Sequence, residues 1–200
     1  MNREIWFKLA FGAAFMIAVS IAASTAKKAA RKHGTQVNQL SNEIRWLIAL
    51  RAALGLLFYA SLAIWLFWSD SFPWMRLPVP DTARWIAAVL LVPVLWFFAA
   101  SFRAIDTNYR GGVGLHDRHS LVMSGPYRYV RHPIYVAFIA IMILVLVMSG
   151  NWMLGLSGIL LVTSIAAARI PVEEKQLHER FGQSWESYSA TTRKVVPLVW

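Results

Sequence analysis

Three runs of apolar residues dominate this sequence, and each is long enough to cross a lipid bilayer as a helix. They extend roughly over Ile5–Ala26, Trp46–Trp68 and Thr82–Phe102. A hydrocarbon core about 30 Å thick needs about 20 apolar residues in helical form. With 58% hydrophobic and only 15% charged residues, the chain also departs from the usual balance of a soluble domain. The sequence therefore predicts a helical membrane protein.

Two shorter apolar runs follow, Ile134–Met148 and Trp152–Ala168. Ser149, Gly150 and Asn151 separate them and form a turn signal, which predicts a helical hairpin. At 1.5 Å per residue these helices reach only about 23 to 25 Å, so their ends should lie in the headgroup region or lean on neighbouring helices. Whatever borders the hairpin is then expected at the membrane surface.

The expected fold class is all-α, a polytopic membrane bundle of about five transmembrane helices with no Rossmann domain. We expect a single membrane domain over residues 1–200. Residues 1–103 should supply three helices, and residues 104–200 a loop, the helical hairpin and a tail.

Lys and Arg are distributed unevenly between the loops. They are frequent in the first loop, the third loop and the tail, whereas the opposite side has only Arg3, Lys8, Arg76 and Arg84. The positive-inside rule then places the N-terminus outside and the tail in the cytoplasm. The net charge of +10 fits anionic lipid headgroups better than nucleic acid, because the basic residues lie between apolar runs. A signal peptide cleaved near Ser24 is the alternative for the first run, but its positive flank lies mainly after that run.

Several features argue against other kinds of site. The chain has no cysteine, which excludes disulfides and thiol nucleophiles. His116, His119 and His132 lack regular ligand spacing, so we expect no metal site. The glycine-rich run Arg110–Gly114 has neither a preceding strand nor a phosphate-binding lysine, so we expect an ordinary loop. Arg51 can snorkel to the membrane surface or face the bundle interior, and snorkelling is the expectation.

The stretch from His119 to Tyr135, HSLVMSGPYRYVRHPIY, precedes and opens the fourth helix. Pro133 suits the first helical position, because its missing N–H has no helical partner there. The helix start beside Arg131 and His132 would then suit an anionic group, through free N–H groups, the positive dipole end and a guanidinium. The plainer alternative is a positively charged flank with a proline helix start.

A second polar stretch, Arg169–Tyr188, follows the fifth apolar run. Pro171 should end or kink that helix and can start an amphipathic one, with Glu173 and Glu174 in its first turn. Such an acidic pair is by itself ordinary capping. Both stretches flank one short hairpin on the same membrane face, however, so we expect them to share a pocket.

Together, the two stretches resemble the isoprenylcysteine carboxyl methyltransferases and their bacterial and archaeal relatives. The shared features are a Gly-x-Tyr, an Arg-His-Pro-x-Tyr at a helix start and, after a hairpin, an Arg, a Glu-Glu pair, a Leu, a Phe-Gly and a Tyr. The matching residues are Gly125, Tyr127, Arg131, His132, Pro133, Tyr135, Arg169, Glu173, Glu174, Leu177, Phe181, Gly182 and Tyr188. The ordered set is specific, whereas the first three helices match only in character.

The resemblance implies a methyltransferase that uses S-adenosylmethionine and acts on a lipophilic acceptor in a bacterial or archaeal inner membrane. It implies that the acceptor is a carboxylate such as a prenylcysteine C-terminus, faced by Arg169 as the substrate-binding and catalytic residue. It also implies a cofactor pocket on the cytoplasmic side, lined by His119, Ser120, Leu121, Val122, Tyr127, His132, Pro133, Ile134, Tyr135 and Glu173. These residue types suit the cofactor, which offers a carboxylate, amino and hydroxyl donors, and an aromatic base.

The expected chemistry needs few groups. A carboxylate nucleophile is ionised at neutral pH, so methyl transfer to it requires alignment rather than a general base. Attack of an anion on a sulfonium cancels charge, which a site screened from water would favour. Three positions depart from the family pattern: Ala137 replaces a common glycine, Trp185 a common tyrosine, and Gly112 an expected polar contact.

Two other functions remain open from the sequence. A related enzyme could methylate a phospholipid amine, a small thiol or another amphiphile. Alternatively, the chain could be an inactive membrane scaffold. Binding of S-adenosylmethionine separates the scaffold from the enzymes, and identification of the product separates the acceptors.

Overall fold

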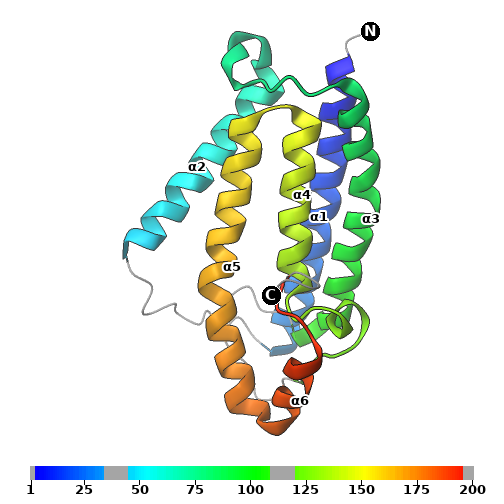
Figure 1. Ribbon diagram of the computed structural model, residues 1–200, viewed down its shortest axis with the longest axis vertical. Coiled ribbons are helices and arrows are strands. Elements are labelled where there is room, and N and C mark those ends of the chain that lie inside the picture. The colour runs from blue at the N-terminus through cyan, green and yellow to red at the C-terminus, as the bar shows by residue number, and fades with distance from the viewer. Residues whose placement is uncertain (1–2, 34–44, 109–119, 196–200) are drawn as a thin grey trace. The chain divides into compact units, whose positions relative to one another are not determined.

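The computed structural model describes residues 3–33, 45–108 and 120–195 (Figure 1). Short 3-10 turns at Ser69–Ser71, Pro73–Met75, Asp106–Asn108 and Gly125–Arg128 connect the helices. The only bridges of β type among the described residues are Arg76 with Asn151 and Val130 with Arg193. The helices are α1 (Arg3–His33), α2 (Arg45–Phe67), α3 (Asp81–Ile105), α4 (Pro133–Ser149), α5 (Trp152–Phe181) and α6 (Gln183–Thr191).

The predicted membrane fold class is confirmed. Within the described residues, α1, α2, α3 and α5 are long and apolar enough to cross a membrane, and α4 is a shorter apolar helix. α4 and α5 form the predicted hairpin, with the turn at Gly150 in a left-handed conformation that suits glycine (φ +59°). Pro133 is the first residue of α4, as its missing N–H predicts.

The proline in α5 does not restart the helix. α5 is continuous over 30 residues with Pro171 inside it, so the predicted separate amphipathic helix from Pro171 is wrong. The cost is one backbone hydrogen bond, to the Ala167 carbonyl, which a long helix in a membrane protein tolerates. Glu173 and Glu174 therefore lie inside a helix, and the capping interpretation fails. Because charged residues begin at Arg169, the last part of α5 extends beyond its apolar, membrane-spanning segment.

The described chain forms two compact units, and α1, α3, α4 and α5 each contribute to both. The first unit contains the described parts of Met1–Ile17, Glu43–Leu95 and Phe138–Ile165, and the second those of Ala18–Asn42, Trp96–Ala137 and Ala166–Trp200. Every predicted site residue that the structure describes belongs to the second unit. The single domain over residues 1–200 stays a prediction.

In the first unit, glycines let α4 and α5 approach closely. A Cβ atom added at Gly155 would lie 2.3 Å from the Leu146 Cβ and 2.6 Å from its Cα. One added at Gly158 would lie 2.6 Å from the Met142 sulfur. Side chains cannot be this close, so packing in this half of the hairpin depends on glycine, as is common between membrane helices.

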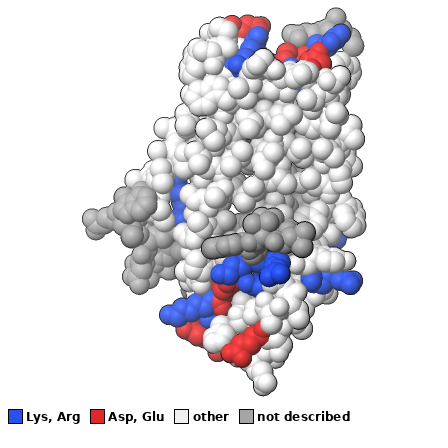
Figure 2. Space-filling model, viewed as in Figure 1, with Lys and Arg blue, Asp and Glu red and all other residues white. Residues whose placement is uncertain are grey.

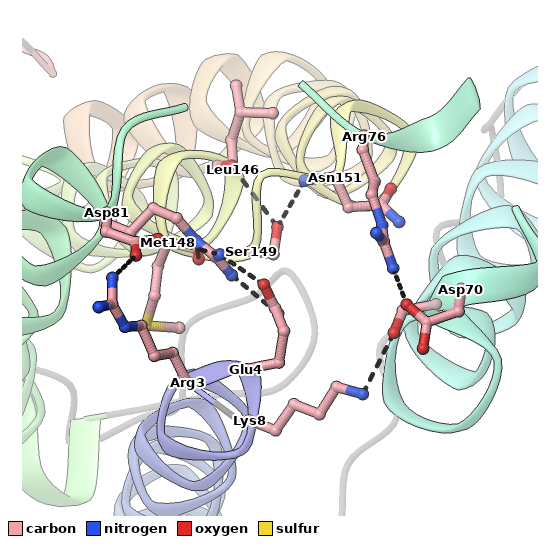
Figure 3. Close-up of polar contacts among 12 residues, drawn as sticks. Arg3, Glu4, Lys8, Asp70, Arg76, Asp81, Leu146, Met148, Ser149 and Asn151 are labelled. Carbon is pink, nitrogen blue, oxygen red and sulfur yellow. Dashed lines mark hydrogen bonds and ion pairs between the residues drawn. The ribbon is translucent and has the colours of Figure 1, made fainter. Parts of the chain in front are cut away.

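A polar cluster in the first unit joins α1, α3 and the end of α4 (Figure 3). Arg84 is 8% exposed and its terminal nitrogens donate to both Glu4 carboxylate oxygens, at 2.5 and 2.9 Å. Its Nε donates to the Met148 carbonyl at 2.8 Å, and its guanidinium lies 4.0 Å from the centre of the Phe7 ring. The buried charge is thus matched by a carboxylate and hydrogen bonds, which is the condition for burying it at all.

Arg51, also in the first unit, does not snorkel as expected. It is half-buried, and its Nη2 donates to the Ser164 carbonyl of α5 at 3.1 Å. A helical carbonyl has a second lone pair, so it can accept this bond beside its helical one. The guanidinium therefore faces a neighbouring helix.

Candidate functional site

The candidate site lies in the second unit, where four segments meet. These are the turn before α4, the charged end of α5, α6, and residues 192–195 after it. In Figure 1 the chain turns back after α6 toward the start of α4. Figure 2 shows Lys and Arg side chains beside Asp and Glu side chains around α6 and the end of α5.

The turn before α4 is held by local and distant bonds. Gly125 has φ +61°, a left-handed conformation that favours glycine, and begins the turn Gly125–Arg128. Tyr127 is buried, and its carbonyl accepts a 2.6 Å hydrogen bond from the Tyr188 hydroxyl of α6. Burial raises the pKa of Tyr188 to about 12, so the phenol stays protonated and remains a donor.

The chain after α6 pairs with the residues just before α4. Val130 and Arg193 form a parallel bridge. The backbone N–H of Arg131 donates to the Arg193 carbonyl at 2.7 Å, and that of His132 donates to the Lys194 carbonyl at 3.1 Å. The segment Thr192–Val195, which we name the C-terminal segment, thus fixes the backbone that positions the His132 ring.

His132 is buried between two carboxylates of α5. Its side chain is 6% exposed, with Nδ1 3.5 Å from Glu173 Oε2 and Nε2 3.4 Å from Glu174 Oε1. The two glutamates are adjacent in the chain, so each faces a different nitrogen of the same ring. This arrangement uses both members of the consecutive acidic pair, and it depends on the continuity of α5 through Pro171.

Of the two carboxylates, Glu174 has the more cationic partners. Arg131 Nε lies 2.8 Å from Oε1 and Lys194 Nζ 3.1 Å from Oε2. Burial opposes ionisation of Glu174, but its contacts with His132, Arg131 and Lys194 outweigh it and lower its pKa to about 2. Glu174 is therefore charged at physiological pH.

Arg131 is committed to these contacts inside the protein. Besides Glu174, its Nη1 donates to the Ser189 carbonyl at 3.0 Å and to the Thr192 carbonyl. The guanidinium also lies 5.8 Å from the centre of the Trp185 ring, which is buried. The residue expected to reinforce an anion site at the start of α4 instead binds α5, α6 and the C-terminal segment.

Glu173 faces a different pair of groups. The Tyr135 hydroxyl donates to Glu173 Oε1 at 3.0 Å, and the Arg169 guanidinium also interacts with this hydroxyl. The centres of the Tyr135 and His132 rings are 6.1 Å apart. The Glu173 side chain is 28% exposed, more than that of Glu174, so one carboxylate of the pair remains reachable by a ligand.

The structure brings some of the predicted residues together and leaves others apart. His132, Tyr135, Arg169 and Glu173 form one connected cluster, with Pro133 between the first two in the chain. Ile134, on the first turn of α4, is half-buried.

The predicted residues upstream of the turn have other surroundings. Ser120 bonds to Asn108, through its hydroxyl at 2.9 Å and its N–H at 3.3 Å. Leu121 and Val122 are half-buried. His119, His116 and Gly112 lie outside the described residues.

Two features of the site escaped sequence analysis. Lys194 gave no signal, because a lone basic residue near the end of a chain has no pattern that assigns it a partner. Glu174 was assigned only to a motif and to helix capping, and its contacts with His132, Arg131 and Lys194 were not predicted. Among the described residues, no group of three His, Asp or Glu side chains is arranged to hold a metal ion.

Comparison with known proteins shows a family resemblance over part of the chain. Residues 86–179 match the family model described as isoprenylcysteine carboxyl methyltransferase (ICMT) family. Over these residues, just under half of the chain, the sequence is similar to the ICMT family. The matched range contains the cluster of His132, Tyr135, Arg169 and Glu173, and it ends before α6 and the C-terminal segment.

Curated relatives named as protein-S-isoprenylcysteine O-methyltransferases share sequence over part of the chain. A protein-S-isoprenylcysteine O-methyltransferase of Schizosaccharomyces pombe is 36% identical over 81 residues, 40% of this chain and 34% of that protein. Protein-S-isoprenylcysteine O-methyltransferase A of Arabidopsis thaliana is 32% identical over 87 residues, 44% of each. The matched stretch thus spans less than half the length of these relatives.

A solved structure shows that the likeness in fold extends further. The structure of the eukaryotic intramembrane Ras methyltransferase ICMT without a monobody superposes with a TM-score of 0.59 and 18% identity. It covers 95% of this chain, and this chain covers 67% of it. At this identity the match supports the fold alone. The first three helices therefore share the ICMT fold, although sequence analysis matched them only in character.

Proposed function

We propose that this chain is an S-adenosylmethionine-dependent methyltransferase that methylates the carboxylate of a lipophilic acceptor, such as a prenylcysteine C-terminus, at the membrane. The observation that carries the proposal is the cluster of His132, Tyr135, Arg169 and Glu173, which lies inside the range matched by the ICMT family. The names of the curated relatives support this reaction class.

The residues present fit the methyl donor. The Glu173 carboxylate is partly exposed and is a strong acceptor for amino or ribose hydroxyl groups. Tyr135 is half-buried and offers aromatic surface to an adenine ring. When bound, S-adenosylmethionine supplies a methyl group on a positively charged sulfur.

Arg169 is the proposed anchor of the acceptor carboxylate. It lies on α5 directly after the apolar segment, where a lipid-tailed molecule would present its polar end. A guanidinium can hold a carboxylate through two parallel hydrogen bonds, which fixes the direction of attack. Transfer forms an oxygen–methyl bond as the sulfur–methyl bond breaks and its electron pair remains on sulfur, so no proton is moved.

We also propose the orientation that the positive-inside rule predicts. The N-terminus would lie outside and the site in the cytoplasm, in a bacterial or archaeal inner membrane. The water-soluble cofactor would then enter from the cytoplasm, while the acceptor would arrive from the bilayer.

The test uses the full chain in detergent with methyl-tritiated S-adenosylmethionine and an S-farnesylated cysteine derivative with a free carboxylate. A methyl ester releases volatile methanol in base, whereas a methylated amine or thioether does not. We expect base-labile label with the wild type and a loss of about tenfold or more in Arg169→Gln, because its aligning hydrogen bonds are gone. Arg180→Gln, an exposed position on the same helix, is the matched control.

Other outcomes would redirect the proposal. Base-stable label in lipid would favour a phospholipid amine, and base-stable label on an added amphiphilic thiol would favour that acceptor. S-adenosylmethionine binding without transfer to any of these would overturn the acceptor class. A folded chain that does not bind S-adenosylmethionine would favour the membrane scaffold.

A further inference from the structure

His132, Lys194 and Glu174 form a network in which each residue contacts the other two. The His132 backbone N–H donates to the Lys194 carbonyl at 3.1 Å. The Lys194 ammonium lies 3.1 Å from Glu174 Oε2, and Glu174 Oε1 lies 3.4 Å from His132 Nε2. One lysine thus binds both the backbone of His132 and the carboxylate that flanks its ring.

Arg131 joins the same network, because it also binds both the C-terminal segment and Glu174. Its backbone N–H donates to the Arg193 carbonyl at 2.7 Å, next to the bond made by Lys194. Its guanidinium pairs with Glu174 at 2.8 Å and donates to the Ser189 and Thr192 carbonyls. The side chains of Arg131 and Glu174 are only 9% and 15% exposed, so neither charge has bulk water as an alternative partner.

We propose that Glu174 is a positioning residue for His132, and that the C-terminal segment Thr192–Val195 is a structural part of the cofactor site. This inference rests on the proposed function, since it assigns His132 to cofactor binding. It adds residues that the family resemblance does not cover, because the C-terminal segment lies outside the matched range 86–179.

Glu173 and Glu174 have different roles because they have different partners. Glu173 is the more exposed carboxylate and bonds to a neutral phenol, so its oxygens can exchange that bond for one to a ligand. Glu174 is bound by two cations and lies against the ring, and exchanging those contacts would leave the buried charge of Arg131 unmatched. Glu174 therefore holds the ring in place, while Glu173 remains available to a ligand.

The primary test compares Glu174→Gln with the wild type in two measurements. We expect S-adenosylmethionine affinity, measured by calorimetry, to fall about tenfold, because a charge-assisted contact to the ring becomes a neutral one. We also expect the ¹⁵N resonances of the His132 ring, assigned by their loss in His132→Asn, to shift. Glu179→Gln, on the exposed side of α5, should change neither measurement.

A second pair of variants tests the C-terminal segment and covers the case in which Glu174→Gln does not fold. Lys194 is 38% exposed, so Lys194→Met is compatible with folding. It should weaken cofactor binding and shift the His132 ring resonances, whereas Lys194→Arg should restore both. Lys175→Met, which removes an exposed lysine of α5, is the control.

The outcomes separate the inference from the proposed function. Wild-type affinity and unshifted ring resonances in folded Glu174→Gln or Lys194→Met would overturn the positioning role. A wild type that does not bind S-adenosylmethionine would overturn the proposed function. In that case the ring resonances still report whether Glu174 and Lys194 position His132.

Discussion

The Tyr135 hydroxyl on α4 donates a 3.0 Å hydrogen bond to Glu173 on α5, across 38 residues of sequence. This bond connects the two motifs that sequence analysis could place only on the same membrane face. It also gives the phenol a measurable role, because it orients the carboxylate proposed to accept hydrogen bonds from the cofactor. We expect Tyr135→Phe to weaken S-adenosylmethionine binding by about three- to tenfold, the effect of one hydrogen bond. Calorimetry checks this, with the exposed Tyr129→Phe as control.

A loss of thermal stability in Tyr135→Phe with unchanged affinity would assign the bond to folding alone. Equal losses of affinity in Tyr135→Phe and Tyr129→Phe would show that the effect is not specific to the cluster.

The lowered pKa of Glu174 predicts acid sensitivity. Its pKa falls from an ordinary 4.5 to about 2, so the folded state binds this proton more weakly than the unfolded state. Its contribution, about 3 kcal/mol by linkage, should be fully present above about pH 5 and lost as the pH falls toward 2. Thermal unfolding in detergent between pH 6 and pH 2.5 should show a steeper loss for the wild type than for Glu174→Gln. Parallel pH profiles of the two proteins would contradict this assignment.

Helix packing in the first unit gives a prediction independent of function. Gly155→Ala should lower the free energy of unfolding by about 1 to 3 kcal/mol, because its Cβ would collide with Leu146. Gly12→Ala in α1, where no atom lies within 4 Å of the added Cβ, should be neutral or stabilising by up to about 1 kcal/mol. Unfolding in mixed micelles measures both, and a Gly155→Ala variant as stable as Gly12→Ala would disprove the close contact.

The ion pair between Arg84 and Glu4 should stabilise the first unit. Arg84→Met leaves the Glu4 carboxylate without its bidentate partner. We expect it to lower the free energy of unfolding by about 2 kcal/mol. This is less than for a fully buried pair, because the Glu4 side chain is 32% exposed. Arg76→Met, which breaks the exposed pair with Asp70, should cost under about 1 kcal/mol. Unfolding in mixed micelles measures both variants. Equal losses in the free energy of unfolding would show that burial of Arg84 does not strengthen its ion pair.

The sequence predicted the membrane helices and the hairpin well, because apolar length and a turn such as Ser149 to Asn151 depend on local chemistry. It failed where tertiary contacts override local preference. Pro171 has a strong local tendency to end a helix, yet α5 continues to Phe181. Arg51 has a general tendency to snorkel, yet it finds a carbonyl on α5.

In the candidate site, too, some residues could be predicted from the sequence and others depend on tertiary contacts. The family resemblance selected His132, Tyr135 and Glu173, which the structure joins in one cluster. The partners of Arg131 and Glu174 could not be predicted, because they depend on how the chain folds back after α6. Lys194 carries no pattern at all, and only its place in the fold gives it a role.

The central claim is that the cluster around His132 and Glu173 binds S-adenosylmethionine. The most direct measurement is calorimetric titration of the full chain in detergent, with the wild type beside His132→Ala and Glu173→Ala, and Glu186→Ala as an exposed control. The account predicts saturable one-to-one binding by the wild type and the control, and a loss of at least about tenfold in affinity in each cluster variant. A folded wild type that does not bind, or cluster variants that bind as tightly as the wild type, would contradict it.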